Sequence, residues 1–322
     1  MKIKLNASII KSDDKIIFLG KKNYQMTDII GPEVEYFLTR LETGLDETEL
    51  QSWLKDDCCY ALYKTMCSLN LLVLSENKYS GTVLEKTYDF LNFHLGTLHS
   101  PFSFKNDIHI ALIGCGGTGS NVGLCLASSG IKKFTLIDYD KVQISNLNRQ
   151  FAYDSADIGK SKVQCLKDKL LRINAEVNVS LYERKITCSE DLHCLPDDVN
   201  LLVSAIDTPA IKSSLYIVEY AMRHKVPVIF GSAGYDTITA GPLLTTEAAK
   251  TEFLSLLQKS SHAVTKPITG SIASTNLLLS AILANNITSL FYPFSKPDLI
   301  NVRKIYNPVS MITMGEISYD NN

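Results

Sequence analysis

Hydrophobic and polar positions change their spacing along the chain, and the changes separate three regions. Residues 1–80 open with the short alternating runs KIKLNASII and KIIFLG, which suggest a hairpin. Three segments then have helical spacing, and the third runs from a helix into a strand: PEVEYFLTRLETG, ETELQSWL and CYALYKTMCSLNLLVL. Two or three short helices beside a small sheet predict a winged-helix-like α+β domain over residues 1–80. Residues 81–106 predict an amphipathic helix and a loop, which form a helical linker.

From Asp107 onward, apolar strands alternate with amphipathic helices. The predicted strands are IHIALIG, KFTLIDYD, VNVSLYER, NLLVSAID and VPVIFGSA, and the helices between them include GSNVGLCLASSG, SKVQCLKDKLLRIN and IKSSLYIVEYAMRH. This alternation is typical of a doubly wound, mostly parallel sheet, which binds ligands at the carboxyl ends of its strands. We therefore predict a second, α/β domain over residues 107–322.

The composition is that of a globular protein, with 45% hydrophobic and 20% charged residues. The 32 Lys and Arg residues nearly balance the 34 Asp and Glu residues, so the net charge of −2 provides no basic field for nucleic acid. No apolar run is long enough for a membrane span, and the first residues lack the apolar stretch of a signal peptide. We expect a cytoplasmic protein that binds neither nucleic acid nor membranes.

The winged-helix-like domain raises the question of DNA binding, and its own charges argue against it. Residues 1–80 carry ten Lys and Arg residues against twelve Asp and Glu residues, whereas a phosphate footprint needs an excess of positive charge. Two other uses remain open. The domain can capture an extended peptide as an added strand at a sheet edge, or it can be a purely structural cap.

The first strand of the α/β domain ends in a glycine-rich loop, Gly114-Cys115-Gly116-Gly117-Thr118-Gly119. It contains G-x-G-x-x-G between a strand and a helix, the context in which this motif binds nucleotides. Glycines let the backbone approach phosphate oxygens, and the helix start presents free N–H groups to them. The second strand ends at Asp138, 19 residues after Gly119, where an acid hydrogen-bonds ribose hydroxyls. These residues predict an adenine nucleotide and leave NAD and ATP open.

Two cations and an amide beyond the second strand favour ATP. Asn146 and Arg149 follow Asp138 in SNLNRQ, and Lys162 lies 13 residues after Arg149. A hydride-transferring enzyme does not need an Arg and a Lys next to its nucleotide. Displacement at phosphorus does, because charge must be neutralised on phosphate oxygens and on the leaving pyrophosphate. Asp207, at the end of a later strand, can hold Mg²⁺ at the same sheet edge.

Together these residues resemble the E1-like (ThiF/MoeB/HesA) family of adenylating enzymes. The resemblance covers residues 107–243 and rests on IGCGGTGS, LIDYDKVQISNLNRQ, DIGKSKV with RIN, SAIDTP and VPVIFGSAGYDTITAGP. It implies a Rossmann-like E1/ThiF domain, extending to residue 322, that adenylates a carboxylate of a peptide with ATP. By matching position it also implies phosphate binding by Gly114, Gly116, Gly117 and Gly119, ribose binding by Asp138, phosphate contacts from Asn146, Arg149 and Lys162, and Mg²⁺ binding by Asp207.

The chain departs from this family in its cysteines. Many members hold zinc with two C-x-x-C pairs in the last third, and members that load ubiquitin-like proteins use a later thioester cysteine. Here the eight cysteines form no C-x-x-C pair and none follows Cys194, so we expect no zinc site and no thioester transfer. The cysteines are instead interpreted as small buried residues.

The domain order narrows the expected function. A small winged-helix-like domain before an E1-like domain resembles the enzymes that mature ribosomally made peptide natural products of the microcin C and pantocin A type. This resemblance implies a peptide clamp over residues 1–80 that recognises the leader of a precursor peptide, and a homodimer. We expect adenylation of a peptide carboxylate, followed by cyclisation, dehydration or nucleotide attachment.

Three other functions stay open. One is activation of a Gly-Gly-ended sulfur-carrier protein, the second is a non-enzymatic scaffold, and the third is an NAD-dependent oxidoreductase.

Overall fold

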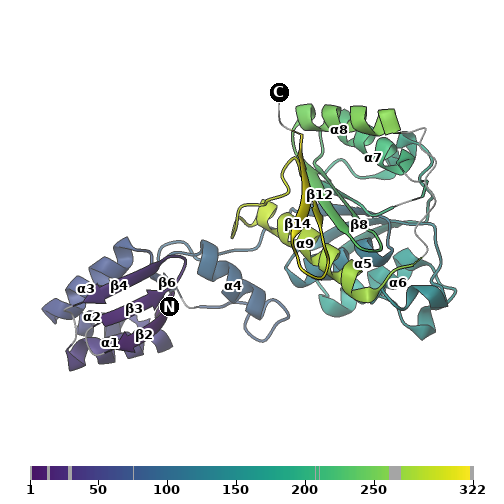
Figure 1. Cartoon of the computed structure of the whole chain (residues 1–322). Helices are drawn as coiled ribbons and strands as arrows, with labels where there is room; N and C mark the ends of the chain where they lie inside the picture. Colours follow the sequence, from purple (N-terminus) through teal and green to yellow (C-terminus); the bar gives the residue numbers. More distant parts are fainter. Residues whose placement is uncertain are drawn as a thin grey trace. The chain divides into compact units, whose positions relative to one another are not determined.

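A computed structural model describes the protein over residues 2–12, 15–27, 31–74, 76–206, 208–209, 211–260 and 270–319. The chain forms two compact units, Met1–Phe104 and Lys105–Asn322 (Figure 1). Each unit buries a hydrophobic core of its own. Among the described residues, no helix combines the length and apolar character needed to cross a lipid bilayer.

The N-terminal unit contains two three-stranded antiparallel sheets, with strand orders β5-β1-β6 and β2-β3-β4. The predicted hairpin exists as β2 and β3, in which Ser8 lies opposite Leu19. The elements are β1 (Lys2–Leu5), β2 (Ser8–Ser12), β3 (Lys15–Leu19), β4 (Asn23–Thr27), α1 (Pro32–Thr43), β5 (Leu45–Asp46), α2 (Glu47–Trp53), α3 (Asp57–Ser68), β6 (Leu72–Leu74) and α4 (Glu85–Leu95).

Local signals in the sequence set the ends of these helices. Helix α1 begins at Pro32 and ends before Gly44, whose φ of 95° favours glycine. The side chain of Asp46 accepts a hydrogen bond from an N–H group in the first turn of α2, and that of Asp56 does the same for α3. Phe18 of β3 and Phe37 of α1 are fully buried in the core that the helices close.

The C-terminal unit is built on one eight-stranded sheet of order β14-β13-β12-β11-β10-β7-β8-β9. Strands β9, β8, β7, β10 and β11 are parallel, and β12, β13 and β14 continue the sheet antiparallel. The strands are β7 (His109–Ile113), β8 (Lys133–Ile137), β9 (Asn178–Tyr182), β10 (Leu201–Ser204), β11 (Val228–Ala233), β12 (Ile238–Leu244), β13 (Val302–Tyr306) and β14 (Thr313–Ser318).

Helices cover both faces of this sheet. On one face, α7 and α8 bury Ile217 and Phe253 against strand residues such as Phe230. The other face carries α5, α6 and α9, which pack on one another and on the sheet (Figure 1). The helices are α5 (Gly117–Ser128), α6 (Lys162–Ile173), α7 (Lys212–Arg223), α8 (Glu247–Ser260) and α9 (Ala273–Phe291), with short 3₁₀ turns η1 (Ile144–Asn146), η2 (Ser155–Asp157) and η3 (Ser189–Cys194).

The strand order places the glycine-rich loop where ligands bind in such sheets. From β7 the chain winds outward through β8 to β9, and it then returns to the other side of β7 for β10 and β11. The loop after β7 therefore lies at the topological switch point of the parallel strands. The predicted doubly wound α/β fold is confirmed for this unit.

Candidate functional site

Two glycines of the loop are required by the protein's own packing. Gly114 has a φ of 98°, and a Cβ there would lie 2.5 Å from the carbonyl oxygen of Ala205. A Cβ on Gly119 would lie 1.9 Å from the carbonyl oxygen of Gly114. The loop can therefore turn tightly against α5 and the segment after β10 only with glycine at both positions.

Gly116 differs, because almost nothing in the described part of the chain lies where its side chain would be. Among these residues, the nearest atom to a Cβ there is Nε2 of Gln150, at 3.9 Å, and the φ of −77° suits any residue. Gly116 also precedes α5, whose first N–H groups receive no cap from a described side chain. The backbone at Gly116 is thus open to close approach by an anionic group, with the helix start directed at it.

Asp138 is held against this loop. Its Oδ2 accepts a hydrogen bond of 2.6 Å from the N–H of Cys115, and its Oδ1 accepts one of 2.8 Å from the N–H of Asp140. Burial raises the pKa of Asp138, although these hydrogen bonds and the charge of Lys162 act in the opposite direction. The structure places the carboxylate at the loop, and its role toward ribose stays a prediction.

Lys162 is the first residue of α6 and is 5% exposed. Its Nζ donates to Oδ2 of Asp140 at 2.8 Å, and its backbone N–H donates to the carbonyl oxygen of Asp140 at 3.1 Å. The ammonium is therefore fixed next to the acids that follow β8. Sequence reasoning missed Asp140, although the second acid in IDYD was a visible signal.

Arg149 lies beside the glycine-rich loop, at the start of α5. Its Nη1 donates to the carbonyl oxygen of Ser145 and to Oδ1 of Asn148, both at 2.9 Å. Its Cγ would be 3.4 Å from a Cβ on Gly117, so the side chain begins beside the start of α5. The Arg149 side chain thus begins beside the glycine-rich loop, and its predicted contact with phosphates stays a prediction.

Asn146 shapes the turn that carries Arg149. The side chain is 7% exposed, and its Oδ1 accepts a hydrogen bond of 3.0 Å from the N–H of Gln143. The Asn146 carbonyl oxygen also accepts from the N–H of Arg149, at 3.1 Å. Its predicted phosphate contact stays a prediction.

Residues that the sequence did not single out hold the loop from two sides. The hydroxyl of Tyr153 donates to the carbonyl oxygen of Cys115 at 2.7 Å, and that of Ser280 on α9 donates to the carbonyl oxygen of Thr118 at 3.2 Å. Asn276, also on α9, leaves no room for a side chain at Gly117, where a Cβ would be 2.4 Å from its Oδ1. No motif marks these contacts, because they join residues far apart in the chain.

The predicted Mg²⁺ ligand, Asp207, lies outside the described residues. The neighbouring backbone is described: the N–H of Ala205 donates to the carbonyl oxygen of Ile113 at 2.8 Å. The segment that leads to Asp207 therefore runs beside the glycine-rich loop. Within the described ranges, no group of three or more His, Cys, Asp or Glu side chains converges to hold a metal ion.

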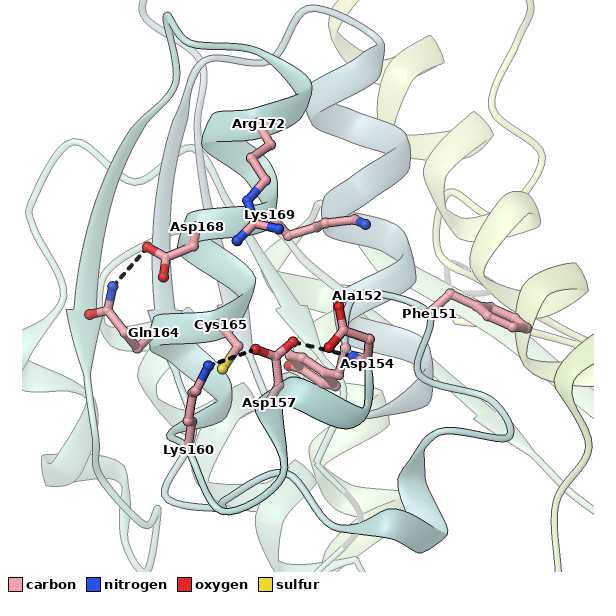
Figure 2. A pocket seen from close by; sticks show the side chains of 11 residues that line it. Phe151, Ala152, Asp154, Asp157, Lys160, Gln164, Cys165, Asp168, Lys169 and Arg172 are labelled. Carbon is pink, nitrogen blue, oxygen red and sulfur yellow. Dashed lines mark hydrogen bonds and ion pairs between the residues drawn. The ribbon is translucent and has the colours of Figure 1, made fainter.

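A polar pocket lies between α6 and residues 151–160 (Figure 2). Lys160 lines it and pairs with Asp157, at 3.4 Å, while Lys169 and Arg172 of α6 contribute further cations. Lys160 and Lys162, two residues apart, therefore have different surroundings, and only Lys162 pairs with an acid that follows β8.

Residues 105–321 match the model of the ThiF family. The chain belongs to the ThiF family. The tRNA threonylcarbamoyladenosine dehydratase of Haemophilus influenzae is 36% identical over 146 residues, which are 44% of this chain and 55% of that protein. The molybdopterin-synthase adenylyltransferase of Escherichia coli is 32% identical over 127 residues, 39% of this chain and 50% of that protein. The chain thus spans about half the length of the curated relatives it matches.

Solved structures resemble the whole ThiF-family chain. E. coli MccB with ATP has a TM-score of 0.73 at 21% identity, covering 99% of this chain and 97% of that chain. PaaA has a TM-score of 0.71 at 21% identity, covering 98% of each chain. These similarities confirm the predicted fold class and the family resemblance drawn from the motifs.

Proposed function

We propose that this ThiF-family chain catalyses the ATP-dependent adenylation of a carboxylate in a ribosomally made precursor peptide. The observation that carries the proposal is the open backbone at Gly116, with Arg149 beside the neighbouring Gly117 and Lys162 paired with Asp140 after the next strand. A phosphate-binding loop with two cations nearby suits displacement at phosphorus better than hydride transfer. The structural similarity to MccB, which has been solved with ATP, supports ATP as the nucleotide.

In the proposed reaction, an oxygen of the peptide carboxylate forms a bond to the α-phosphorus of ATP. The bond from that phosphorus to the oxygen bridging to the β-phosphorus breaks, and pyrophosphate leaves with the electron pair. The glycine-rich loop fixes the phosphates, while Arg149 and Lys162 neutralise charge on the non-bridging and departing oxygens. Asp138 orients the ribose and Asn146 contacts the phosphates. Asp207 would hold Mg²⁺, which would supply further positive charge to the phosphates.

We assign recognition of the peptide to the N-terminal unit. Strands β2 and β4 are the outer strands of one small sheet, and within the described residues no other strand pairs with their outer edges. An extended peptide can add to such an edge through backbone hydrogen bonds. MccB has been solved with MccA, and its similarity covers this unit as well. A nitrogen or carbon nucleophile of the same peptide then attacks the acyl carbon and AMP leaves, or the acyl group stays linked to the nucleotide. We expect the enzyme to act as a homodimer.

Exchange of labelled pyrophosphate into ATP tests this function. The purified chain is assayed with the short peptide encoded beside its gene, with a Gly-Gly-ended carrier protein, with tRNA and with no added substrate. The proposal predicts exchange that depends on the peptide. Exchange with the carrier or the tRNA alone, or no exchange with any of the three, contradicts it.

A second candidate is activation of a Gly-Gly-ended sulfur-carrier protein. The 32% identity to molybdopterin-synthase adenylyltransferase favours it. The N-terminal unit and the lack of any cysteine after Cys194 favour the peptide instead.

A further inference from the structure

Asn121 joins the two halves of the candidate site. It lies in the second turn of α5 and is 2% exposed. Its Nδ2 donates to the carbonyl oxygen of Gly117 at 2.7 Å and to the carbonyl oxygen of Arg149 at 3.2 Å. One amide nitrogen therefore connects the helix start at the glycine-rich loop to the backbone of the arginine 28 positions away.

Folding alone gives little reason for an amide at this position. The Oδ1 of Asn121 is buried and has no hydrogen-bond partner among the residues that the structure describes, and a buried polar atom without a partner destabilises the folded state. Asn is also a weaker helix former than Ala. What the amide adds is the bond to Arg149, because α5 can close its hydrogen bond to Gly117 with backbone atoms alone.

We propose that Asn121 is a positioning residue that fixes Arg149 at the distance from the glycine-rich loop that the nucleotide phosphates require. The inference rests on the proposed function, because it takes Arg149 to contact those phosphates. The hydrogen bonds of Nη1 to Ser145 and Asn148 orient the guanidinium within its own loop. Asn121 then sets where this loop stands relative to Gly117, so that both groups reach one ligand.

A double-mutant cycle on MgATP affinity, measured by calorimetry on the full chain, tests the role. We expect Asn121→Ala to weaken MgATP binding on the order of tenfold in the wild-type background and by less than about twofold in the Arg149→Ala background. Asn121→Asp keeps the size of the side chain and removes its N–H donors, so its loss should be at least as large. The matched control is Asn174→Ala. Asn174 is also buried and also has an amide atom without a partner among the described residues, but it lies at the C-terminal end of α6, away from Lys162.

Thermal unfolding separates positioning from folding. Asn121→Ala should unfold close to the wild-type temperature, because removal of the unpartnered oxygen offsets the loss of the two hydrogen bonds from Nδ2. An equal loss of affinity with and without Arg149, or wild-type affinity in Asn121→Asp, overturns the proposal.

Pyrophosphate exchange keeps the two proposals distinguishable. In that assay, we expect Asn121→Ala to lower kcat more than it raises the KM for the peptide, since Asn121 is only 2% exposed and offers no surface to a peptide. If the wild type binds MgATP but shows no exchange with any substrate, the proposed function fails and the affinity cycle still decides the role of Asn121. A wild-type chain without affinity for MgATP overturns both.

Discussion

The candidate site of the C-terminal unit and the N-terminal unit differ in how deeply their paired cations are buried. In the C-terminal unit, the Lys162 side chain is 7% exposed and pairs with Asp140, which is 46% exposed, and the Asp138 carboxylate accepts two backbone hydrogen bonds. In the N-terminal unit, the ion pair of Arg40 and Glu49 is about one-third exposed on both sides, at 35% and 32%. A buried charge keeps its geometry, whereas a pair whose cation reaches solvent contributes less to stability.

The same contrast extends to the backbone. The glycine-rich loop is tied on several sides, while β2 and β4 of the N-terminal unit have outer edges without a partner strand in the described chain. A site that stabilises developing charge needs fixed groups, and a clamp that adds a strand needs free backbone groups. The comparison indicates that the catalytic site requires side chains and backbone in fixed positions, whereas peptide recognition requires unpaired backbone groups. Substitutions in each unit can test this difference.

The largest effect is expected at Gly119. The Cβ of Gly119→Ala would lie 1.9 Å from the Gly114 carbonyl oxygen, so the loop must move. We expect loss of measurable ATP binding and a decrease of about 1–3 kcal/mol in the free energy of unfolding.

Gly116→Ala is the comparison that makes the result informative. The nearest atom to its Cβ is 3.9 Å away, so the free energy of unfolding should change by less than about 1 kcal/mol while ATP affinity still falls. Calorimetry and denaturant unfolding measure the two quantities. Equal ATP affinities in Gly116→Ala and the wild type would show that no phosphate approaches this backbone.

Lys162→Met is expected to have the next largest effect. It removes the charge and keeps much of the length, so pyrophosphate exchange should fall by about 10²- to 10³-fold. Arg40→Met in the N-terminal unit and Lys160→Met at the polar pocket remove charges of the same sign and should leave the exchange rate within about twofold of the wild type. Equal losses in all three variants would contradict a specific role for Lys162.

Much of the candidate site was predictable, because its residues lie in loops that directly follow the parallel strands. The end of β7, the start of α5 and the acid after β8 have local signatures: an apolar run, a G-x-G-x-x-G motif and a polar residue at the strand end. The placement of Arg149 and Lys162 near the loop followed from the rule that parallel strands present their carboxyl ends at one edge.

The rest depends on contacts that no local pattern encodes. In the sequence, Asn121 has no feature that distinguishes it from other residues of its predicted helix. Asn276 and Ser280 contact the glycine-rich loop only because α9 packs on α5. Strand β14, with the sequence TMGEIS, was not predicted, because its mostly exposed residues lack an alternating pattern. Asp207 lies outside the described residues, so its assignment stays a prediction.

Separating the units tests the division directly. Each has its own core, so fragments 1–104 and 105–322 should both fold. Fragment 105–322 should bind ATP with about wild-type affinity and show a KM for the peptide raised about tenfold or more, because the clamp no longer concentrates the substrate. Circular dichroism confirms folding before the exchange assay. An unchanged KM in folded 105–322 would remove peptide recognition from the N-terminal unit.

The smallest effect is a pH dependence of stability from His109, at the end of β7 opposite the glycine-rich loop. His109 is 1% exposed, its Nδ1 lies 2.9 Å from Oδ1 of Asp198, and its Nε2 lies 2.9 Å from Oγ1 of Thr135. Burial lowers the pKa of His109, while the neighbouring Asp198 opposes that shift. The folded state therefore favours the neutral ring, and the unfolded chain takes up the proton first as the pH falls.

This contribution to stability is complete above the unfolded pKa of about 6.5 and is lost as the pH falls from there toward the lower folded pKa. We expect the Tm of the wild type to decrease between about pH 7.5 and about pH 5.5, and the decrease to be smaller in His109→Gln, which does not titrate. Differential scanning calorimetry of fragment 105–322 isolates the effect from the N-terminal unit. An equal decrease in Tm for both proteins would mean that other titratable groups cause the loss of stability at low pH. It would also mean that the core around His109 accepts the protonated ring without loss of stability.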